Sequence, residues 1–195
     1  MAEACLGKHL VFEDAGQVVA GRIVEAEAYL GPEDRAAHSF GGRRTDRNEV
    51  MYGPPGHAYV FFIYGMHFHM NLVTDAPGFP SAVLIRAVEP LLGEEVMRSR
   101  RGNPKKRVLL TNGPGKLCQA FGIHRDHGGY DLCQPPLYLA DGPAPQKIRR
   151  VPRIGVDYAG GWAKRLLRFV DAESSFLSVP PPKPTRKRGA VASVE

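Results

Sequence analysis

The stretch Arg22-Ile23-Val24-Glu25-Ala26-Glu27-Ala28-Tyr29-Leu30 predicts the strand around which the chain is organised. Side chains alternate faces along a strand, so one face is expected to carry Ile23, Glu25, Glu27 and Tyr29, and the other Val24, Ala26, Ala28 and Leu30. The two carboxylates would then lie roughly 6–7 Å apart. Partial burial and mutual repulsion would raise the pKa of at least one, which is typical of a general base. The alternative is that both carboxylates face solvent from a half-exposed strand.

Composition indicates a globular protein with a basic surface. The chain has 195 residues, of which 43% are hydrophobic and 24% charged, and we find neither an internal repeat nor a second domain. Its net charge of +6 favours a polyanionic partner without proving one. No apolar run reaches the length of a membrane span and no signal-peptide pattern is present. We therefore expect an intracellular, cytoplasmic protein with no membrane partner.

The three cysteines, Cys5, Cys118 and Cys133, are too few and too scattered for a disulfide framework. They form no Cys-x-x-Cys or Cys/His pattern of the kind that binds zinc. We expect a reducing cytosol and no structural metal.

Alternation and turn residues predict a mostly β chain. Strands are expected at residues 6–12, 17–30, 81–87, 137–140 and 149–156, and two more within 58–73 on either side of Tyr64-Gly65-Met66. Helical patterns cover residues 89–101, with Pro90 in the first turn, and 117–121. A short helical turn is expected within 32–37, inside a long loop at 31–56.

The expected hairpin tip at Tyr64 exposes an aromatic ring where there is no core to fill, which indicates a contact surface. The alternative is that the turn lies elsewhere and Tyr64 belongs to the core. His67 and His69 share a strand face and are candidate metal ligands, but no third ligand lies in register with them.

Several basic residues call for an explanation. Arg86 interrupts an apolar strand, so it is expected to pair with a buried carboxylate, Glu25 or Glu27 being the candidates. Arginines in the 31–56 loop and in the 98–107 cluster either grip phosphates or are simply solvated. The segment 112–116 is not a P-loop, although its backbone N–H groups and Lys116 could hold one phosphate. The basic, proline-rich residues 180–195 are expected to be disordered.

The sequence closely resembles the alkyladenine (3-methyladenine) DNA glycosylase family. The resemblance rests on several motifs in the same order along nearly the whole chain, from about residue 6 to 179. They are Gly21 to Asp34, Ala36 to Ser39, Ile63 to Met66, Met70-Asn71, Arg86 to Pro90, Asn112 to Gln119, Arg153 to Val156 and Ala159 to Ala163.

The resemblance implies an α+β fold, a single domain over residues 1–179 built on a curved antiparallel β-sheet with flanking helices and a protruding β-hairpin. It also implies a monofunctional enzyme of base excision repair that needs no metal or cofactor. Such an enzyme flips alkylated or deaminated purines out of duplex DNA and hydrolyses the N-glycosidic bond, leaving an abasic site. We expect it to act as a monomer on duplex DNA containing damaged purines.

Site residues carried over by motif fall into four groups. Glu27 resembles the general base, and Arg86 and the backbone carbonyl of Ile154 would help to hold the water. The flipped base would lie against Tyr29, His38, Phe61 and Asn71. Tyr64, flanked by Met66 and His67, would fill the gap in the base stack, and phosphate contacts are expected at Arg43, Thr45, Lys116 and Arg125. The family often has a tyrosine where this chain has Phe61, which keeps the stacking face and loses the hydroxyl.

Two other classes of function stay open on the residues alone. A non-catalytic nucleic-acid-binding module would explain the charge and the aromatic residues, but has no need of two carboxylates near a polyanion. A carbohydrate hydrolase would use paired carboxylates on O-glycosides, but the positive charge and an exposed Tyr64 argue against it.

Overall fold

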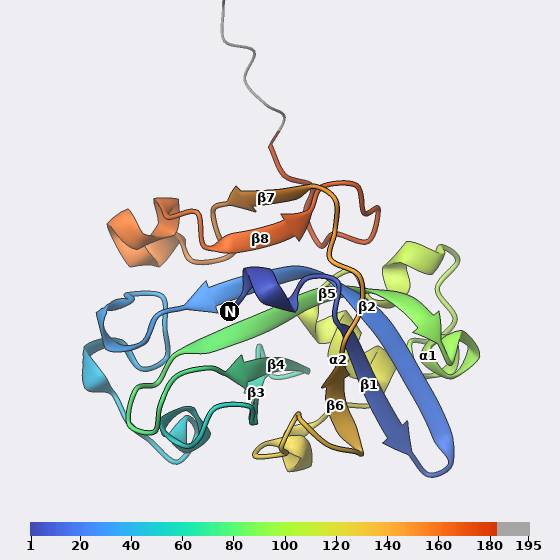
Figure 1. Ribbon diagram of the computed structural model, residues 1–195, viewed down its shortest axis with the longest axis horizontal. Helices are drawn as coiled ribbons and strands as arrows, with labels where there is room; N and C mark the ends of the chain where they lie inside the picture. The colour runs from blue at the N-terminus through green and yellow to red at the C-terminus, as the bar shows by residue number, and fades with distance from the viewer. Residues whose placement is uncertain (183–195) are drawn as a thin grey trace, which may run out of the picture.

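A computed structural model describes residues 1–182 of the chain, and strand β2 (Gln17–Tyr29) lies at the centre of its sheet (Figure 1). The first half of β2 pairs with β1 (His9–Asp14), the second half pairs with β8 (Arg168–Asp171), and β5 (Ala82–Leu92) runs along the other edge. The antiparallel order is β3-β4-β5-β2-β1-β6, with β7 attached through β8. The remaining strands are β3 (Ala58–Ile63), β4 (His67–Val73), β6 (Leu137–Ala140) and β7 (Ile148–Val151).

Helices contribute less than strands. In the described residues the α-helices are α1 (Glu94–Arg100) and α2 (Pro114–Phe121), and α2 packs against β4. Short 3-10 helices fill the connections: Glu3–Cys5, Gly31–Glu33, Phe40–Gly42, Glu49–Tyr52, Arg107–Leu110, Arg125–His127 and Asp157–Lys164. The expected single-domain α+β fold on a curved antiparallel sheet is confirmed. No helix within residues 1–182 is long and apolar enough to cross a membrane.

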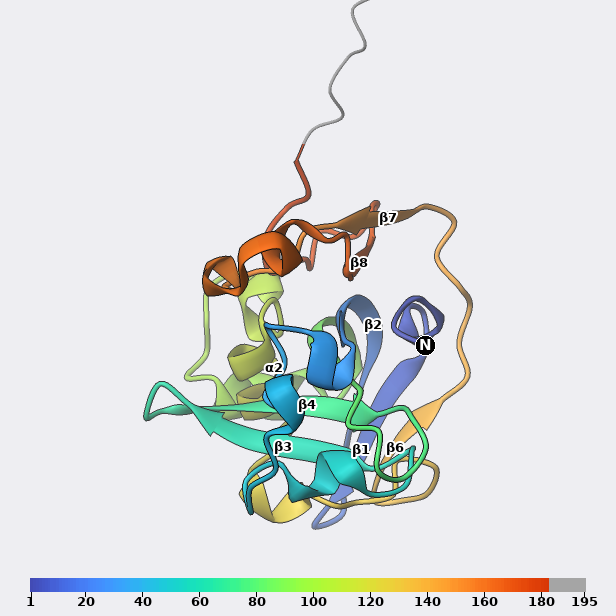
Figure 2. The same ribbon diagram turned by 90° about the vertical axis from the view of Figure 1, so that its left-hand side faces the viewer.

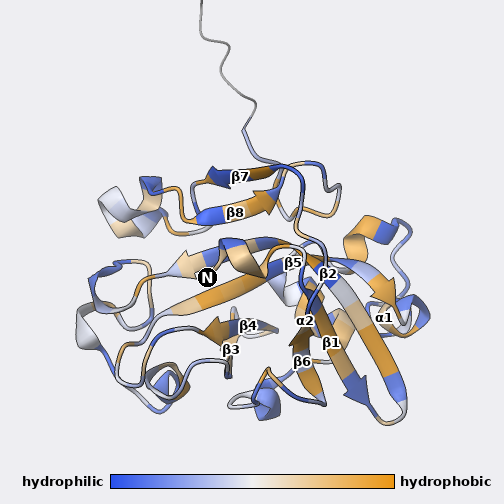
Figure 3. Ribbon diagram, in the orientation of Figure 1, coloured by the Kyte–Doolittle hydropathy of each residue, from blue (hydrophilic) through white to orange (hydrophobic). Residues whose placement is uncertain are grey.

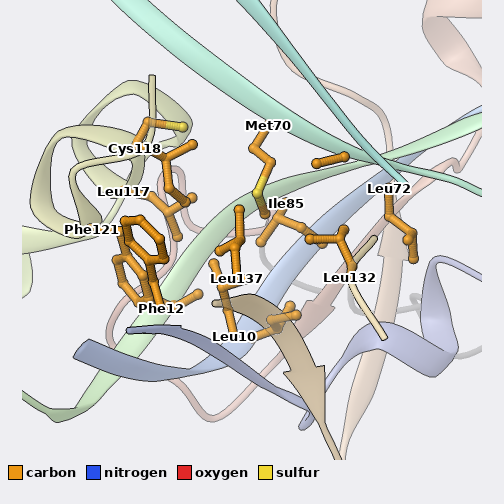
Figure 4. Close-up of a cluster of buried hydrophobic side chains, with 14 of the residues drawn as sticks. Leu10, Phe12, Met70, Leu72, Ile85, Leu117, Cys118, Phe121, Leu132 and Leu137 are labelled. Atoms are coloured by element: carbon orange, nitrogen blue, oxygen red, sulfur yellow. The ribbon is translucent and has the colours of Figure 1, made fainter. Parts of the chain in front are cut away.

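The main core lies between the curved sheet and α2. Its side chains come from strands distant in sequence and from the helix, for example Leu10, Met70, Ile85, Phe121 and Leu137 (Figure 4). The apolar segments of β1, β2 and β5 converge on this region when the chain is coloured by hydropathy (Figure 3). Each such fully buried side chain stabilises the fold by about 1.5–3 kcal/mol. The core therefore makes the sheet a rigid support for the side chains on its other face.

Two register shifts change the predicted faces of β2. Val24 is an extra residue on β2 opposite the step from Val88 to Ala87, and Arg86 is an extra residue on β5 opposite the step from Glu25 to Ala26. The prediction that Ile23 shares the glutamate face is therefore wrong, because a bulge inverts the alternation. Ile23 lies in the main core, while Val24 joins a second cluster beneath β7 and β8.

Two predicted hairpins are confirmed. β1 and β2 join through Ala15 and Gly16, and β3 and β4 join through Tyr64, Gly65 and Met66. In the second hairpin the Met66 N–H donates to the Ile63 carbonyl at 3.3 Å, and the two residues between them, Tyr64 and Gly65, have positive φ, 53° and 69°, as in a type I′ turn. The β3–β4 hairpin projects beyond the rest of the fold (Figure 2).

Three predicted elements have different limits in the structure. The helix predicted for 89–101 is wrong in its first part, because β5 continues to Leu92 and α1 begins at Glu94. Pro90 lies where the β2–β5 register shifts, a position at which a strand tolerates proline. The basic strand predicted to reach residue 156 ends at Val151, and the first strand begins at His9. The predicted disordered tail, 180–195, lies outside the described residues from position 183 onward.

Candidate active site

Both glutamates of β2 are completely buried, so the alternative in which they face solvent is wrong. They are covered by β8, which pairs with this half of β2, and by the loop after β7. Burying a carboxylate is costly unless it is paired and hydrogen-bonded, so the partners of each glutamate decide its state.

Arg86 contacts both glutamates, as its position in an apolar strand predicts. Its Nε donates to Glu25 Oε1 at 3.0 Å and its Nη1 donates to Glu27 Oε2 at 3.2 Å. The bulge in β5 places this guanidinium between two carboxylates that are two residues apart on the neighbouring strand. The Arg86 guanidinium therefore fixes the positions of the two carboxylates relative to each other.

Glu25 has four donors around it. It accepts from Arg86, from Arg168 Nη1 at 3.0 Å, and from both the backbone N–H and the hydroxyl of Ser178, at 2.6 and 2.7 Å. Three of these hydrogen bonds end on Oε1, and the one from the Ser178 N–H ends on Oε2. Glu25 therefore anchors the C-terminal segment to the sheet.

Glu27 lies two residues after Glu25 on the same strand, but its surroundings differ. Its Oε2 accepts from Tyr29 Oη at 3.0 Å as well as from Arg86, and its Oε1 accepts only from the backbone N–H of Ile154, at 2.8 Å. One acceptor site on Oε1 therefore stays open. Burial raises the pKa of Glu27, and Arg86 and the two other donors oppose this rise.

A cavity of about 430 Å³ lies next to Glu27, which is fully buried and does not itself line it. The three groups that donate to Glu27 all line it: Tyr29, Arg86 and Ile154. The structure also brings all four predicted base-contact residues to this one cavity, namely Tyr29, His38, Phe61 and Asn71. A cavity of this size, mostly apolar with a few polar groups, is typical of a small-molecule site.

One side of the cavity is a layer of rings. Phe61 and Tyr59 stack with their centroids 5.3 Å apart, and the His38 ring meets Phe61 edge-on at 4.6 Å. His38 Nδ1 and Tyr59 Oη lie 2.9 Å apart. Burial lowers the pKa of His38 to about 4, assisted by Arg47 and Arg43, so this imidazole is neutral at neutral pH. Tyr59 was not predicted, although it lies two residues before Phe61 and so on the same strand face.

Tyr29, another residue of the cavity wall, rests on an ion pair that was not predicted from the sequence. The Arg153 guanidinium makes two hydrogen bonds to Asp34, one of 2.8 Å, and both side chains are fully buried. Arg153 also donates to the carbonyl of Ala28 at 2.8 Å and lies over the Tyr29 ring at 4.7 Å. The ion pair therefore supports the Tyr29 ring, and it fixes the backbone at Arg153, the residue before Ile154.

Exposed aromatic side chains mark the mouth of the cavity. Tyr64 at the hairpin tip is 78% exposed and Met66 beside it is 69% exposed, so the alternative in which Tyr64 belongs to the core is wrong. Tyr158, another residue that was not predicted, is 72% exposed and lines the same cavity. His67 is exposed at the base of the hairpin and lies against Gly115 of α2.

A second, basic cavity of about 300 Å³ adjoins the first, and His38, Tyr59 and Tyr158 line both. It contains Arg43 and Thr45, two of the predicted phosphate contacts. The Thr45 hydroxyl donates to Asn48 at 3.0 Å.

Three other candidate phosphate contacts, Arg44, Lys116 and Arg125, lie outside the two cavities. Arg44 is paired with Glu49 on the exposed side of the loop. Lys116 lies in the first turn of α2 and donates to Asn112 at 2.8 Å. Arg125 belongs to the 3-10 helix Arg125–His127, which contributes no residue to either cavity. Glu94 pairs with Arg98 and Arg107, which favours the solvated-surface interpretation of the 98–107 cluster.

His67 and His69 lie on the same strand, and only His69 lines the cavity. Among residues 1–182 no group of three or more His, Cys, Asp or Glu side chains is arranged to hold a metal ion. All three cysteines are free, with Cys133 exposed.

Comparison with known proteins agrees with this geometry. A family model for methylpurine-DNA glycosylase matches residues 1–175. Relatives provisionally named 3-methyladenine DNA glycosylase include one from Methanocella arvoryzae, 52% identical over 91% of this chain and 89% of its own length. Those from Desulfitobacterium hafniense and Myxococcus xanthus are 49% and 48% identical, over 92% and 96% of this chain and 92% and 91% of their own. The chain therefore belongs to the methylpurine-DNA glycosylase family and is a DNA-repair hydrolase that cleaves N-glycosyl bonds.

Proposed function

We propose that the protein flips an alkylated or deaminated purine out of duplex DNA into the 430 Å³ cavity and hydrolyses its N-glycosidic bond with a water activated by Glu27. The substrates in this proposal are 3-methyladenine, 7-methylguanine, hypoxanthine and ethenoadenine, and the product is an abasic site. A base inside a duplex is out of reach, so extrusion must precede chemistry at a cost of a few kcal/mol.

The observation that carries the proposal is the difference between the two buried glutamates. Glu25 accepts four hydrogen bonds, and Arg168 and Ser178, which donate three of them, line no part of the cavity. Glu27 accepts only one hydrogen bond on Oε1, and each of its own donors lines the cavity. A water bound there would give its proton to Glu27 as its oxygen attacks C1′ of the sugar. The Ile154 carbonyl and Arg86 would orient that water. The anionic carboxylate would also stabilise the oxocarbenium-like sugar.

The ring layers support a purine as the group bound. Tyr29, held by Arg153, and Phe61, stacked on Tyr59, offer flat apolar faces to the cavity. Stacking on such faces is worth about 1–3 kcal/mol per base. In the tautomer of neutral His38 that accepts from the Tyr59 hydroxyl at Nδ1, the proton is on Nε2 and would donate to the base edge. Asn71 would limit purines that carry a 2-amino group, and among these 7-methylguanine would still be released because its positive charge makes it a good leaving group.

The exposed hairpin supports insertion into the duplex. Tyr64 is held in the left-handed region by a tight turn, a strained position for a large side chain that is typical of functional sites. We propose that it takes the place of the flipped base, with Met66 and His67 beside it. Arg43, Thr45, Lys116 and Arg125 would contact phosphates, and the protein would act as a monomer.

The test is single-turnover release of free base from duplexes carrying one 7-methylguanine, 3-methyladenine, hypoxanthine or ethenoadenine. The wild-type protein is expected to release base and leave an alkali-labile abasic site, whereas Glu27→Gln binds the same duplex without cleavage. Binding of lesion DNA without release by either protein would leave a lesion-binding module as the better explanation.

A further inference from the structure

His69 is the one histidine in the cavity whose imidazole has no hydrogen-bond partner anywhere in residues 1–182. It lies on β4 directly opposite Phe61 of β3, and the two rings meet at 5.4 Å and 65°. Burial lowers the pKa of His69 to about 4, helped by the nearby charge of Arg86. The side chain is therefore neutral at neutral pH, with one N–H donor and one free acceptor nitrogen.

Three other polar side chains in the cavity wall each have at least one hydrogen-bond partner within the protein, although Nε2 of His38 has none within residues 1–182. The Tyr29 hydroxyl donates to Glu27, the His38 ring is bound to Tyr59, and the Asn71 amide donates to the carbonyl of Tyr59 at 3.2 Å. His69 is partly exposed, so water can reach its imidazole, and a ligand that fills the cavity either replaces that water with a complementary polar atom or loses the hydrogen bond.

The chemistry of the proposed reaction supplies such an atom. When the N-glycosidic bond breaks, its electron pair stays on the purine while the oxygen of water bonds to C1′ and the water proton passes to Glu27. A purine alkylated on a ring nitrogen is a cation, so the electron pair neutralises it. A neutral purine such as hypoxanthine would depart as an anion and then take a proton from solvent. Stabilisation of that anion therefore matters for neutral lesions alone.

We propose that His69 is a specificity-determining residue whose imidazole N–H binds a ring nitrogen of the flipped purine and stabilises the charge that develops on a neutral leaving base. The inference rests on the proposed function, since it assigns a role within the same cavity. The His69 ring contacts Phe61 and lines the cavity that is proposed to bind the base, with the charge of Arg86 nearby.

The test compares hypoxanthine with 7-methylguanine in one protein, so that the cationic lesion reports on folding and DNA binding. His69→Leu is expected to lower the ratio of the two single-turnover rates about tenfold, the value of one hydrogen bond. His69→Gln, which keeps an N–H donor, is expected to recover most of that ratio. The matched control is His57→Leu, because His57 precedes β3 at the end away from the hairpin and lines neither cavity.

An unchanged ratio in His69→Leu would overturn the inference, as would an equal loss of both reactions, which would mean a merely structural role. Either result would leave the proposed function standing if the wild type releases 7-methylguanine and Glu27→Gln does not. Failure of the wild type to release any base would instead refute the proposed function, and the inference with it.

Discussion

Replacing Glu27 with glutamine is expected to abolish excision while leaving the protein folded. The amide has the same shape, and its oxygen can still accept from Tyr29 and Arg86. The amide nitrogen then faces the Ile154 N–H, so one hydrogen bond of 2.8 Å is lost. An unsatisfied buried donor costs about 1–3 kcal/mol. Removing a buried charge whose pKa is raised by burial offsets part of this cost.

The effect on rate is expected to be far larger than the effect on stability. Loss of a general base costs about 10²–10⁴ in rate, and loss of one preorganised electrostatic contact costs a further 10²–10³. The product is at least about 10⁴, equivalent to about 5.4 kcal/mol at 1.36 kcal/mol per factor of ten. Binding of lesion DNA is expected to persist, because the residues proposed to contact DNA are unchanged.

Glu25→Gln is the matched control, two residues away on the same strand. Glu25 lies between Arg86 and Arg168 with four hydrogen bonds, so removing its charge breaks a buried network at a cost of about 3–5 kcal/mol. Its rate per folded molecule is expected to change much less than that of Glu27→Gln. Urea denaturation gives the folded fraction, and single-turnover release of 7-methylguanine gives the rate. Equal rate losses in the two variants, after correction for folding, would refute the assignment of Glu27 as the base.

Four further outcomes follow from the geometry. Tyr64→Gly should raise the melting temperature, because relief of positive φ is worth about 1–2 kcal/mol, yet slow excision from duplex DNA. Phe61→Leu should weaken lesion-DNA binding by about 1–3 kcal/mol in fluorescence titration, the value of one stacking contact. Burial raises the pKa of Asp34, but the ion pair with Arg153 outweighs it and lowers this pKa below 3.8. The ion pair therefore stabilises the folded protein above about pH 4, and this stabilisation is lost in more acid solution as Asp34 becomes protonated. Asp34→Asn should therefore cost about 3–5 kcal/mol at pH 7 in urea denaturation and progressively less as pH falls through the folded pKa. Because Glu27 must be ionised and its pKa is raised above 4.5, excision of 7-methylguanine should decline on the acid side around a pKa higher than that of a free glutamate.

The sequence was sufficient for features that local chemistry dictates. An arginine inside an apolar strand needs a carboxylate, and the structure places Arg86 against both Glu25 and Glu27. The hairpin at Tyr64 followed from two aromatic, β-branched segments around a glycine. The hairpin is encoded by residues that are close together in the sequence. The Arg86 pairing follows because a buried arginine needs a carboxylate and few carboxylates were available in neighbouring apolar strands.

Features that depend on register or on distant pairing were out of reach. The bulge at Val24 moves Ile23 to the main core, and nothing in the alternation of that stretch announces an extra residue. Arg153 and Asp34 are 119 positions apart, and Ser178 reaches Glu25 from 153 positions away. Charged residues at such separations have many candidate partners in the sequence, and only the folded sheet selects one.

The bulge also explains how two glutamates that are two residues apart on one strand acquire different surroundings. Arg86 is the extra residue on β5, so its side chain reaches both acids instead of pairing with one. Glu25 then takes up the donors of Ser178 and Arg168, which fasten the last strand and the C-terminal segment to the sheet. That closure brings the loop after β7 over β2 and puts the Ile154 N–H on Glu27. Glu25 thus helps to build the wall that holds Glu27, and in the proposed function the cost of burying this second charge is borne where it can serve catalysis.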